Sequence, residues 1–328
     1  MIPVAADVWR ITTPLPFRPR EVHAYLVKSG ERRFFLVDGG VDTADAWAAL
    51  DTGVREIAGG WAAVAAHVVT HMHIDHLGLA WRVRERCGAR LLMGRLDAER
   101  AAHADANPEE EAAYRGALLR ESGAPPALLP PVKTRGRPTP PLSRYVPVDL
   151  PLDGEADDLP DIAGWRWIWT PGHTAGHVSL FRLADRVLIG GDAVLPRITP
   201  TIGVNRQRTD PVGDYLQTLD RLEAVKPVRV LPGHGEPLEE PAARLRELRE
   251  ATLNESDLVL GCLSEAPLSA WEVTRCRHIR SDLPPSVQML ALRETLAHLR
   301  HLVGAARVEM LEMNDGVPGF RAKGGSAG

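Results

Sequence analysis

The chain has 328 residues, of which 44% are hydrophobic and 25% are charged, and its formal net charge is −4. This length can bury a full core in one large domain with a smaller one beside it. The charge balance gives no overall attraction to nucleic acid or to anionic lipid, so neither is expected as the main partner. Three widely spaced cysteines, no apolar span and no leader-like start predict a soluble protein of the cytoplasm that stays off the membrane.

The first part of the chain predicts successive strands over residues 4–11, 22–27 and 33–37, separated by proline-rich and Ser-Gly turns. Asp38 follows the third strand and precedes two glycines, which is ordinary turn chemistry. Thr43 predicts the N-cap of a helix that runs to about residue 57. A further apolar strand is predicted over residues 66–69.

A dense cluster of metal-capable side chains follows that strand in the segment Thr-His-Met-His-Ile-Asp-His, residues 70–76. It contains His71, His73, Asp75 and His76. Imidazole and carboxylate are ligands of zinc and other borderline first-row ions, and this order of residues can serve two ions from a strand-to-helix turn. Core packing or helix capping would explain one histidine, but four unpaired polar side chains are costly to bury. The segment therefore predicts a dinuclear metal site.

Beyond this cluster we predict a helix over residues 77–86, a strand over 89–93 and a charged helix over 95–120. The amino-acid composition then changes to a proline-rich insertion at about residues 121–147, and its prolines cannot continue a helix. Because it lies between two metal motifs, we favour a lid or a substrate-side insertion over a loose linker. Its basic residues are either solvated charges or contacts for an anionic substrate. Strands are predicted to resume over residues 145–150 and 162–169.

Three later motifs each place a His or an Asp after a predicted strand and among glycines, where the backbone can turn tightly. Pro-Gly-His-Thr-Ala-Gly-His follows the strand predicted over residues 162–169 and supplies His173 and His177. Gly-Gly-Asp ends a second strand with Asp192, and Pro-Gly-His-Gly ends the strand predicted over 228–231 with His234. The three tryptophans that alternate in the first of these strands predict sheet packing rather than a platform for stacking bases.

The motifs HMHIDH, PGHTAGH, GGD and PGHG occur in the order typical of the metallo-beta-lactamase superfamily, and residues 4–237 resemble that family. The resemblance implies an α/β fold, an αββα sandwich with a metal site at one edge of two packed sheets. It also implies two ligand sets, one of His71, His73 and His173 and one of Asp75, His76 and His234, with Asp192 bridging both ions.

Other residues near the implied site follow from the same resemblance. Asp38 would orient a metal-bound imidazole from behind, and His177 would lie behind the ligands without being one. The zinc beta-lactamases carry a cysteine ligand where this chain has Asp192, which instead resembles the glyoxalase II, ribonuclease Z and lactonase branches. Antibiotic hydrolysis is therefore not the default expectation.

The segment after Asp192 supplies the candidates for substrate contact. It leaves the bridging position and is expected to run past the metals, so the candidates are Arg197, Thr199, Thr201, Asn205 and Arg206. Asp210 and Pro211 then predict the start of a helix, with Asp at the N-cap and Pro at the first helical position.

The C-terminal part changes to helices, predicted over residues 242–263, 269–278 and 286–303, followed by two short strands. We therefore predict a catalytic domain over residues 1–240 and a small domain over 241–328 whose outline resembles a winged helix. Reading DNA would need a basic recognition helix, and the third helix offers only Arg293 and Arg300 beside Glu294. A packing or dimerising appendage that walls the active site is the favoured interpretation, and nucleic-acid binding and a homodimer remain options.

These features favour a dinuclear hydrolase of a small molecule, with two divalent ions that are zinc by preference and iron or manganese as alternatives. Two cations about 3.5–4 Å apart can hold a bridging hydroxide that attacks a carbonyl carbon. The leading substrates are an ester, a thioester or a lactone, with Asp75 and Asp192 as the catalytic carboxylates. A phosphodiesterase or ribonuclease acting on RNA and an iron-dependent oxidoreductase similar to the persulfide dioxygenases are the alternatives.

Overall fold

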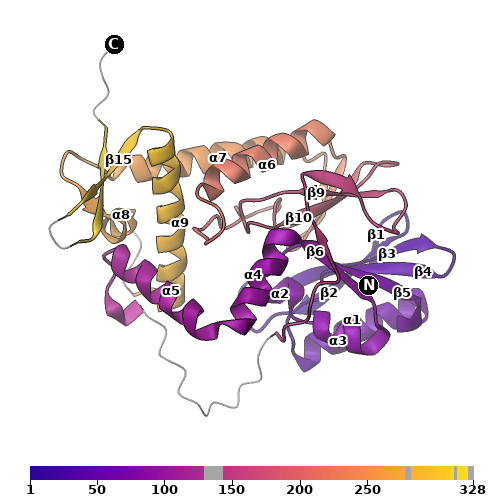
Figure 1. Ribbon diagram of the computed structural model, residues 1–328. Coiled ribbons are helices and arrows are strands. Elements are labelled where there is room, and N and C mark those ends of the chain that lie inside the picture. Colours follow the sequence, from indigo (N-terminus) through magenta and orange to yellow (C-terminus); the bar gives the residue numbers. More distant parts are fainter. Residues whose placement is uncertain (129–142, 278–281, 314–315, 324–328) are drawn as a thin grey trace.

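The structure is a computed structural model that describes residues 1–128, 143–277, 282–313 and 316–323 (Figure 1). Two mixed sheets pack face to face around a shared apolar core. Helices lie against the outer face of each sheet, with α1 and α3 on one side and α6 and α7 on the other. The predicted α/β fold, an αββα sandwich, is confirmed.

The first sheet has the strand order β1-β2-β3-β4-β5-β6-β7, antiparallel from β1 to β4 and parallel from β4 to β7. The single strand predicted over residues 4–11 is wrong, because Asp7 turns with a φ of 56° and divides it into a hairpin of β1 and β2. The strand predicted over 145–150 is also wrong, since only its last residue belongs to β7. The bounds are β1 (Ile2–Ala5), β2 (Val8–Pro14), β3 (Glu21–Gly30), β4 (Arg33–Val37), β5 (Val64–Val69), β6 (Arg90–Gly94) and β7 (Leu150–Leu152).

The second sheet has the order β13-β12-β11-β10-β9-β8, with only β11 and β12 parallel. Trp165 and Trp167 of β9 are buried between the sheets, and Trp165 meets Phe35 edge to face at 5.7 Å, so the predicted sheet packing is confirmed. The strand β10 was not predicted. The bounds are β8 (Ala156–Asp158), β9 (Trp165–Trp169), β10 (Val178–Arg182), β11 (Val187–Gly191), β12 (Arg229–Pro232) and β13 (Leu238–Glu239).

Helix starts follow the predicted caps. The Thr43 hydroxyl accepts the Ala46 N–H at 3.2 Å, and the Asp210 carboxylate accepts the Gly213 N–H at 2.8 Å. The single helix predicted over residues 95–120 is wrong: it breaks at Asn107, because Pro108 restricts the residue before it and lacks an N–H. The helix predicted over 77–86 starts later, at Ala80, and Leu77 instead ends a separate short helix. The bounds are α1 (Ala44–Ala58), α2 (Ile74–Leu77), α3 (Ala80–Cys87), α4 (Arg95–Ala106), α5 (Pro108–Glu121) and α6 (Pro211–Val225), with 3-10 turns η1 (Trp61–Ala63) and η2 (Pro126–Leu128).

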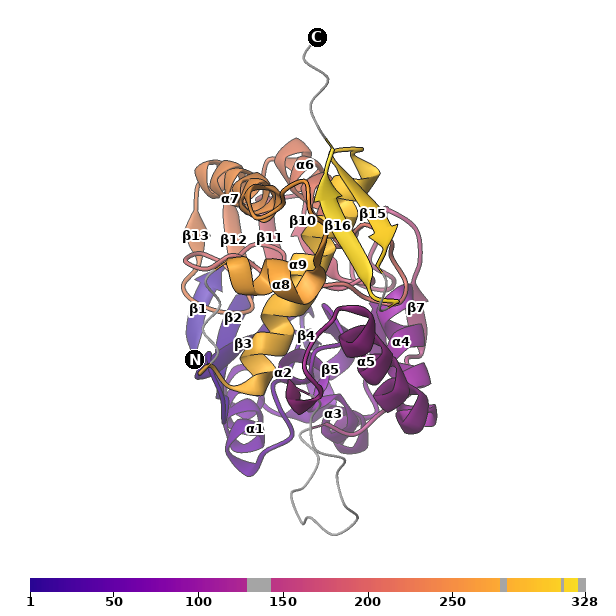
Figure 2. The same cartoon turned by 90° about the vertical axis from the view of Figure 1, so that its left-hand side faces the viewer.

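The C-terminal segment consists of helices and a small antiparallel sheet of order β14-β16-β15 (Figure 2). One apolar cluster joins Leu299 of this segment to Leu219 of α6 and Val230 of β12, so it packs directly on the sandwich. Its division into a separate winged-helix domain stays a prediction. The bounds are α7 (Ala242–Gly261), α8 (Ala270–Cys276), α9 (Pro285–Gly304), β14 (Leu268–Ser269), β15 (Val308–Glu312) and β16 (Pro318–Ala322).

Two further predictions concern the proline-rich insertion and the absence of a membrane span. Most of the proline-rich insertion, residues 129–142, lies outside the described residues, so its role as a lid stays a prediction. None of the helices in the described ranges is long and apolar enough to cross a membrane.

Candidate metal centre

The metal motifs meet at one edge of the sandwich because each follows the carboxyl end of a strand: β5, β9, β11 or β12. Hydrogen bonds tie the two sheets together there. The backbone N–H of His23 donates to the backbone carbonyl of Gly233 at 2.8 Å, and the backbone N–H of Val178 donates to the backbone carbonyl of Thr70 at 2.8 Å. Side chains more than 100 residues apart in the sequence therefore face one small volume.

The first trio of predicted ligands is a tight group of imidazole nitrogens. His71 Nε2 lies 3.0 Å from His73 Nδ1, and His173 Nε2 lies 2.9 Å from the same atom. Three nitrogens around a tetrahedral zinc ion are expected at about 3.3 Å from one another, from metal–nitrogen bonds of about 2.0 Å. The three side chains thus have the spacing of a metal ligand set before any adjustment.

The second trio lies beside the first, and Asp192 lies between them. Asp75 Oδ2 is 3.4 Å from His234 Nε2, and both lie within 4.8 Å of a ring nitrogen of His76. Asp192 Oδ2 is 3.6 Å from His173 Nε2 of the first trio and 3.6 Å from His234 Nε2 of the second. One carboxylate oxygen is thus equally distant from a member of each trio.

Two buried atoms at this centre lack the partner that burial normally demands. Asp192 Oδ1 and His76 Nε2 face each other at 3.5 Å, but neither takes part in a hydrogen bond. A buried polar atom without a partner costs about 1–3 kcal/mol. A divalent cation satisfies both atoms at once, so the side chains present fit the metal ions that the motifs predicted.

Backbone carbonyls orient two of the imidazoles. His173 donates from Nδ1 to the Thr201 carbonyl at 2.9 Å, and His234 donates from Nδ1 to the Glu21 carbonyl at 2.7 Å. A proton fixed on Nδ1 leaves the lone pair of Nε2 directed at the centre, as a metal ligand needs. The tautomer therefore follows from the fold.

Asp38 performs this role for His76 and fixes the loop as well. Its Oδ2 accepts from His76 Nδ1 at 2.8 Å, and its Oδ1 accepts the Thr70 N–H at 2.8 Å. The Thr70 hydroxyl donates to the same carboxylate at 2.9 Å. Burial opposes a charged His76, but Asp38 and then Asp192 outweigh it and raise the pKa of His76 above its usual value. Asp38 thus lies directly behind the imidazole of His76, one of the predicted ligands.

His177 is committed to the protein on both ring nitrogens. Nδ1 lies 2.7 Å from the Thr170 hydroxyl, and Nε2 accepts the backbone N–H of Asp192 at 3.1 Å. Because this lone pair already holds Asp192 in place, His177 supports the bridging position from behind, and burial lowers its pKa well below the usual value.

Burial keeps the three imidazoles of the first trio neutral, which is the form that binds metal. It lowers the pKa of His73 to about 3, with the neighbouring His173 adding to the effect, and it lowers the pKa of His71 well below its usual value. Burial opposes ionisation of Asp75, but the hydrogen bond from His234 prevails and lowers its pKa to about 2. Asp75 is therefore a carboxylate at neutral pH.

Asp97 is a residue that sequence analysis missed. It lies buried in the first turn of α4, where its carboxylate accepts the Met72 N–H at 2.9 Å, the Gly176 N–H at 2.6 Å and the Thr174 hydroxyl at 2.7 Å. Met72 belongs to the first metal loop, and the other two belong to the second. One carboxylate thus clamps two ligand loops, and an acidic residue in a first helical turn gives no sequence signal of this role.

The predicted substrate contacts separate into two groups. Thr199 and Thr201 line a pocket of about 230 Å³ that opens onto both trios. Arg197 is exposed and does not line it. Asn205 caps the turn at residues 207–208 through its side-chain oxygen, and Arg206 pairs with Glu110 on α5, so both are engaged away from this pocket. Sequence analysis missed the pocket residues Pro19, Leu195, Ile198, Gly203, Leu290 and Arg293.

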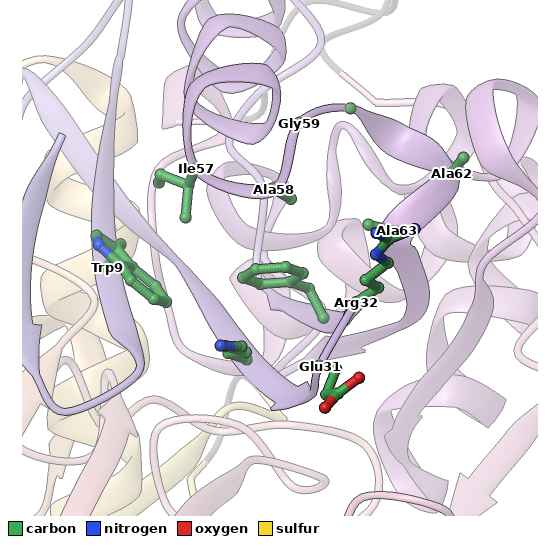
Figure 3. A pocket seen from close by; sticks show the side chains of 11 residues that line it. Trp9, Glu31, Arg32, Ile57, Ala58, Gly59, Ala62 and Ala63 are labelled. Atoms are coloured by element: carbon green, nitrogen blue, oxygen red, sulfur yellow. The ribbon is translucent and has the colours of Figure 1, made fainter.

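A larger hollow of about 630 Å³ lies elsewhere on the first sheet, away from the metal motifs (Figure 3). Trp9, Phe34 and Ile57 give it an apolar surface, and Glu31 and Arg32 lie along it. Its lining contains no His, Cys or Asp among the described residues. Its size therefore does not make it the reactive site, and the metal-capable groups remain with the smaller pocket.

The sandwich and its His and Asp clusters define a metal-binding α/β protein. The family model described as Metallo-beta-lactamase superfamily matches residues 17–234, and the chain belongs to that superfamily. The expectation of a metal-dependent hydrolase fold is thereby confirmed.

Relatives span most of the chain. It is 26% identical over 308 residues to a probable metallo-hydrolase, YqjP, of Bacillus subtilis (strain 168), covering 89% of this chain and 91% of that protein. A beta-lactamase-like protein 2 homolog of Caenorhabditis elegans is 27% identical over 45% of this chain and 48% of its own length. A solved metallo-beta-lactamase family protein of Thermus thermophilus has a TM-score of 0.80 at 28% identity, covering 98% of this chain and 100% of that one. A beta-lactamase domain protein of Burkholderia ambifaria reaches 0.78, at 28% identity and with 98% and 93% covered.

Proposed function

We propose that the chain is a dinuclear metal-dependent hydrolase that cleaves a small ester, thioester or lactone. The observation that carries the proposal is the position of Asp192 Oδ2, which is 3.6 Å from a ligand candidate of each trio. The ligand sets are His71, His73 and His173 for one ion and Asp75, His76 and His234 for the other. Their imidazole and carboxylate donors favour zinc, with iron or manganese as the alternatives.

Two such ions would lower the pKa of a shared water enough for it to attack a carbonyl carbon at neutral pH. The chain's own side chains position the metal ligands and transfer the proton. Asp192 would join the two ligand sets as the bridging carboxylate, and His177 holds Asp192 in place by accepting its backbone N–H. Asp75 is ionised and faces the pocket, so its carboxylate can accept the proton of the attacking water and return it to the leaving group.

The shape of the pocket supports a small substrate. About 230 Å³ is below the range of about 300–1,000 Å³ typical of sites for drug-sized ligands. The apolar Leu195, Ile198 and Leu290 form part of its lining. A phosphodiester backbone normally requires clustered cations, and the described lining contains one arginine and no lysine. A carbonyl substrate is therefore favoured over RNA.

Hydrolysis of a substrate panel by the metal-loaded protein tests the proposal. The panel contains a thioester, a lactone, an aryl ester, a beta-lactam and bis-p-nitrophenyl phosphate. We expect turnover of a carbonyl substrate that Asp192→Ala abolishes and that Asp185→Ala retains, because Asp185 pairs with Arg182 on the β10–β11 turn, outside the pocket. Turnover of the phosphodiester alone, or oxygen uptake with bound iron, would replace this function with one of the two alternatives.

A further inference from the structure

One wall of the metal pocket comes from the C-terminal segment. Leu290 and Arg293 lie three residues apart in α9 and both line the pocket, on the same face of the helix. Figure 2 shows α9 crossing in front of the sheets, with α2 near its lower end. The loop after Asp192 supplies Leu195 and Ile198 to the same pocket. The helix α9 thus contributes Arg293 to the pocket that opens onto the metal centre.

Arg293, the one arginine in the described lining of the pocket, has no acidic partner, unlike two arginines of the loop that precedes α6. Its Nη2 donates to the Val204 carbonyl at 2.9 Å, and no carboxylate in the described part of the chain forms an ion pair with it. By contrast, Arg206 pairs with Glu110 and Glu111, and Arg208 pairs with Asp214.

Glu294, the acidic neighbour of Arg293 in the sequence, forms no ion pair with it in the described part of the chain. Glu294 lines a separate cavity together with Arg277, on another face of α9. Burial disfavours the charged form of Arg293 and lowers the pKa of its guanidinium, although Tyr114 and Glu294 oppose this shift through their charges. An arginine is nevertheless always charged in a protein. The pocket therefore holds a partly desolvated positive charge that forms no ion pair with a carboxylate in the described part of the chain.

A desolvated cation is costly unless an anion pairs with it, and the planar fork of a guanidinium matches a carboxylate. We propose that Arg293 binds a carboxylate of the substrate and is the residue that determines its specificity. The substrate is then a small ester, thioester or lactone in which an apolar spacer, lying along Leu195, Ile198 and Leu290, joins the carboxylate to the reacting carbonyl. This inference rests on the proposed hydrolase function. It specifies in addition that the substrate carries a negative charge at one end and an apolar spacer next to the reacting carbonyl.

A matched pair of aryl esters tests the inference in the zinc-loaded protein. One is 4-nitrophenyl hydrogen glutarate, which has a free carboxylate, and the other is its neutral methyl ester. We expect the wild type to prefer the acid, and Arg293→Met to lower kcat/KM for the acid by about 10- to 100-fold, mainly through KM, with little change for the methyl ester. Arg293→Lys keeps the charge but loses the fork, so we expect it to fall between the two.

The control is Arg300→Met, because Arg300 lies two turns later in the same helix and lines a different cavity. We expect Arg300→Met to retain the preference for the acid. An equal loss for both esters in Arg293→Met would show that Arg293 only anchors the loop at Val204, and a wild type without preference for the acid would overturn the inference.

A binding measurement separates this inference from the proposed hydrolase function. By calorimetry on the metal-free protein, we expect hexanoate to bind more tightly than hexanamide, and Arg293→Met to remove the difference. Failure of every ester to react, with this difference intact, would count against the hydrolase function alone. Equal binding of the acid and the amide to the wild type would count against the role of Arg293.

Discussion

Replacing Asp97 with alanine should weaken both the fold and the metal centre. The change leaves the Met72 N–H, the Gly176 N–H and the Thr174 hydroxyl without the acceptors they have at 2.6–2.9 Å. Each buried donor left unpaired costs about 1–3 kcal/mol, so the three together predict a loss of roughly 3 kcal/mol or more in the free energy of unfolding. Because two ligand loops lose their shared clamp, we also expect zinc affinity to fall about 10- to 100-fold.

Two measurements check this prediction. Urea denaturation of the metal-free protein gives the change in stability, and competition with a chelator gives the change in zinc affinity. Asp105→Ala is the matched control, since Asp105 is an exposed residue of the same helix. Asp97→Asn keeps the shape but offers one acceptor oxygen in place of two, so it should lie between the wild type and Asp97→Ala. If Asp97→Ala and Asp105→Ala behave alike in both measurements, the clamp has no role and the reasoning is refuted.

Three further changes test other parts of the structure. Asp38→Asn removes the negative charge behind His76, so chelator competition should show zinc binding about 10- to 100-fold weaker, and unchanged binding would contradict the role of Asp38. Burial lowers the pKa of His298 to about 3, below the value of about 6.5 in an unfolded chain, so protonation of the unfolded state destabilises the fold as the pH falls from 6.5 towards 3. His298→Gln should make the fall in unfolding free energy shallower by up to about 1.4 kcal/mol per pH unit, and parallel profiles would contradict this. Gly172 has a φ of 131°, and a Cβ there would lie 2.5 Å from the Cβ of Tyr215, so Gly172→Ala should lower the melting temperature by several degrees, and an unchanged temperature would show that this loop can move aside freely.

The sequence predicted the parts of the site that carry their chemistry in short motifs. His71, His173, Asp192 and His234 each follow an apolar strand, three of them among glycines, and the strands do bring them to one edge. This works because the motif contains both the ligand and the turn that aims it. The strand, the turn and the side chain are local in the sequence, so no knowledge of the packing was needed to place them.

The missed residues act through contacts between distant segments. Asp97 accepts hydrogen bonds from two loops, one of them 79 residues away in the sequence. The residues next to Asp97 in the sequence give no sign of these contacts. Arg293 was noted in the sequence only as one of two arginines of a predicted helix, and the packing of α9 against the sandwich places it in the lining of the pocket. Arg206 was predicted to contact the substrate because its segment leaves Asp192 and was expected to run past the metals. In the structure it instead forms ion pairs with Glu110 and Glu111 of α5.

The wrong secondary-structure predictions have local causes. The helix predicted over residues 95–120 ends early at Asn107 because one proline outweighs a strong run of helix formers. The strand β10 gives little sequence signal because it starts directly after His177, with no turn residues between it and the metal motif.

The metal-to-protein ratio of the purified chain, measured by mass spectrometry, tests the central claim most directly. We predict two divalent ions per wild-type chain, a loss of bound metal in Asp192→Ala, and two ions retained in Asp185→Ala, because only Asp192 stands between the two trios. One ion per chain, or a ratio of two that survives Asp192→Ala unchanged, would contradict the bridged dinuclear centre on which the proposed hydrolysis depends.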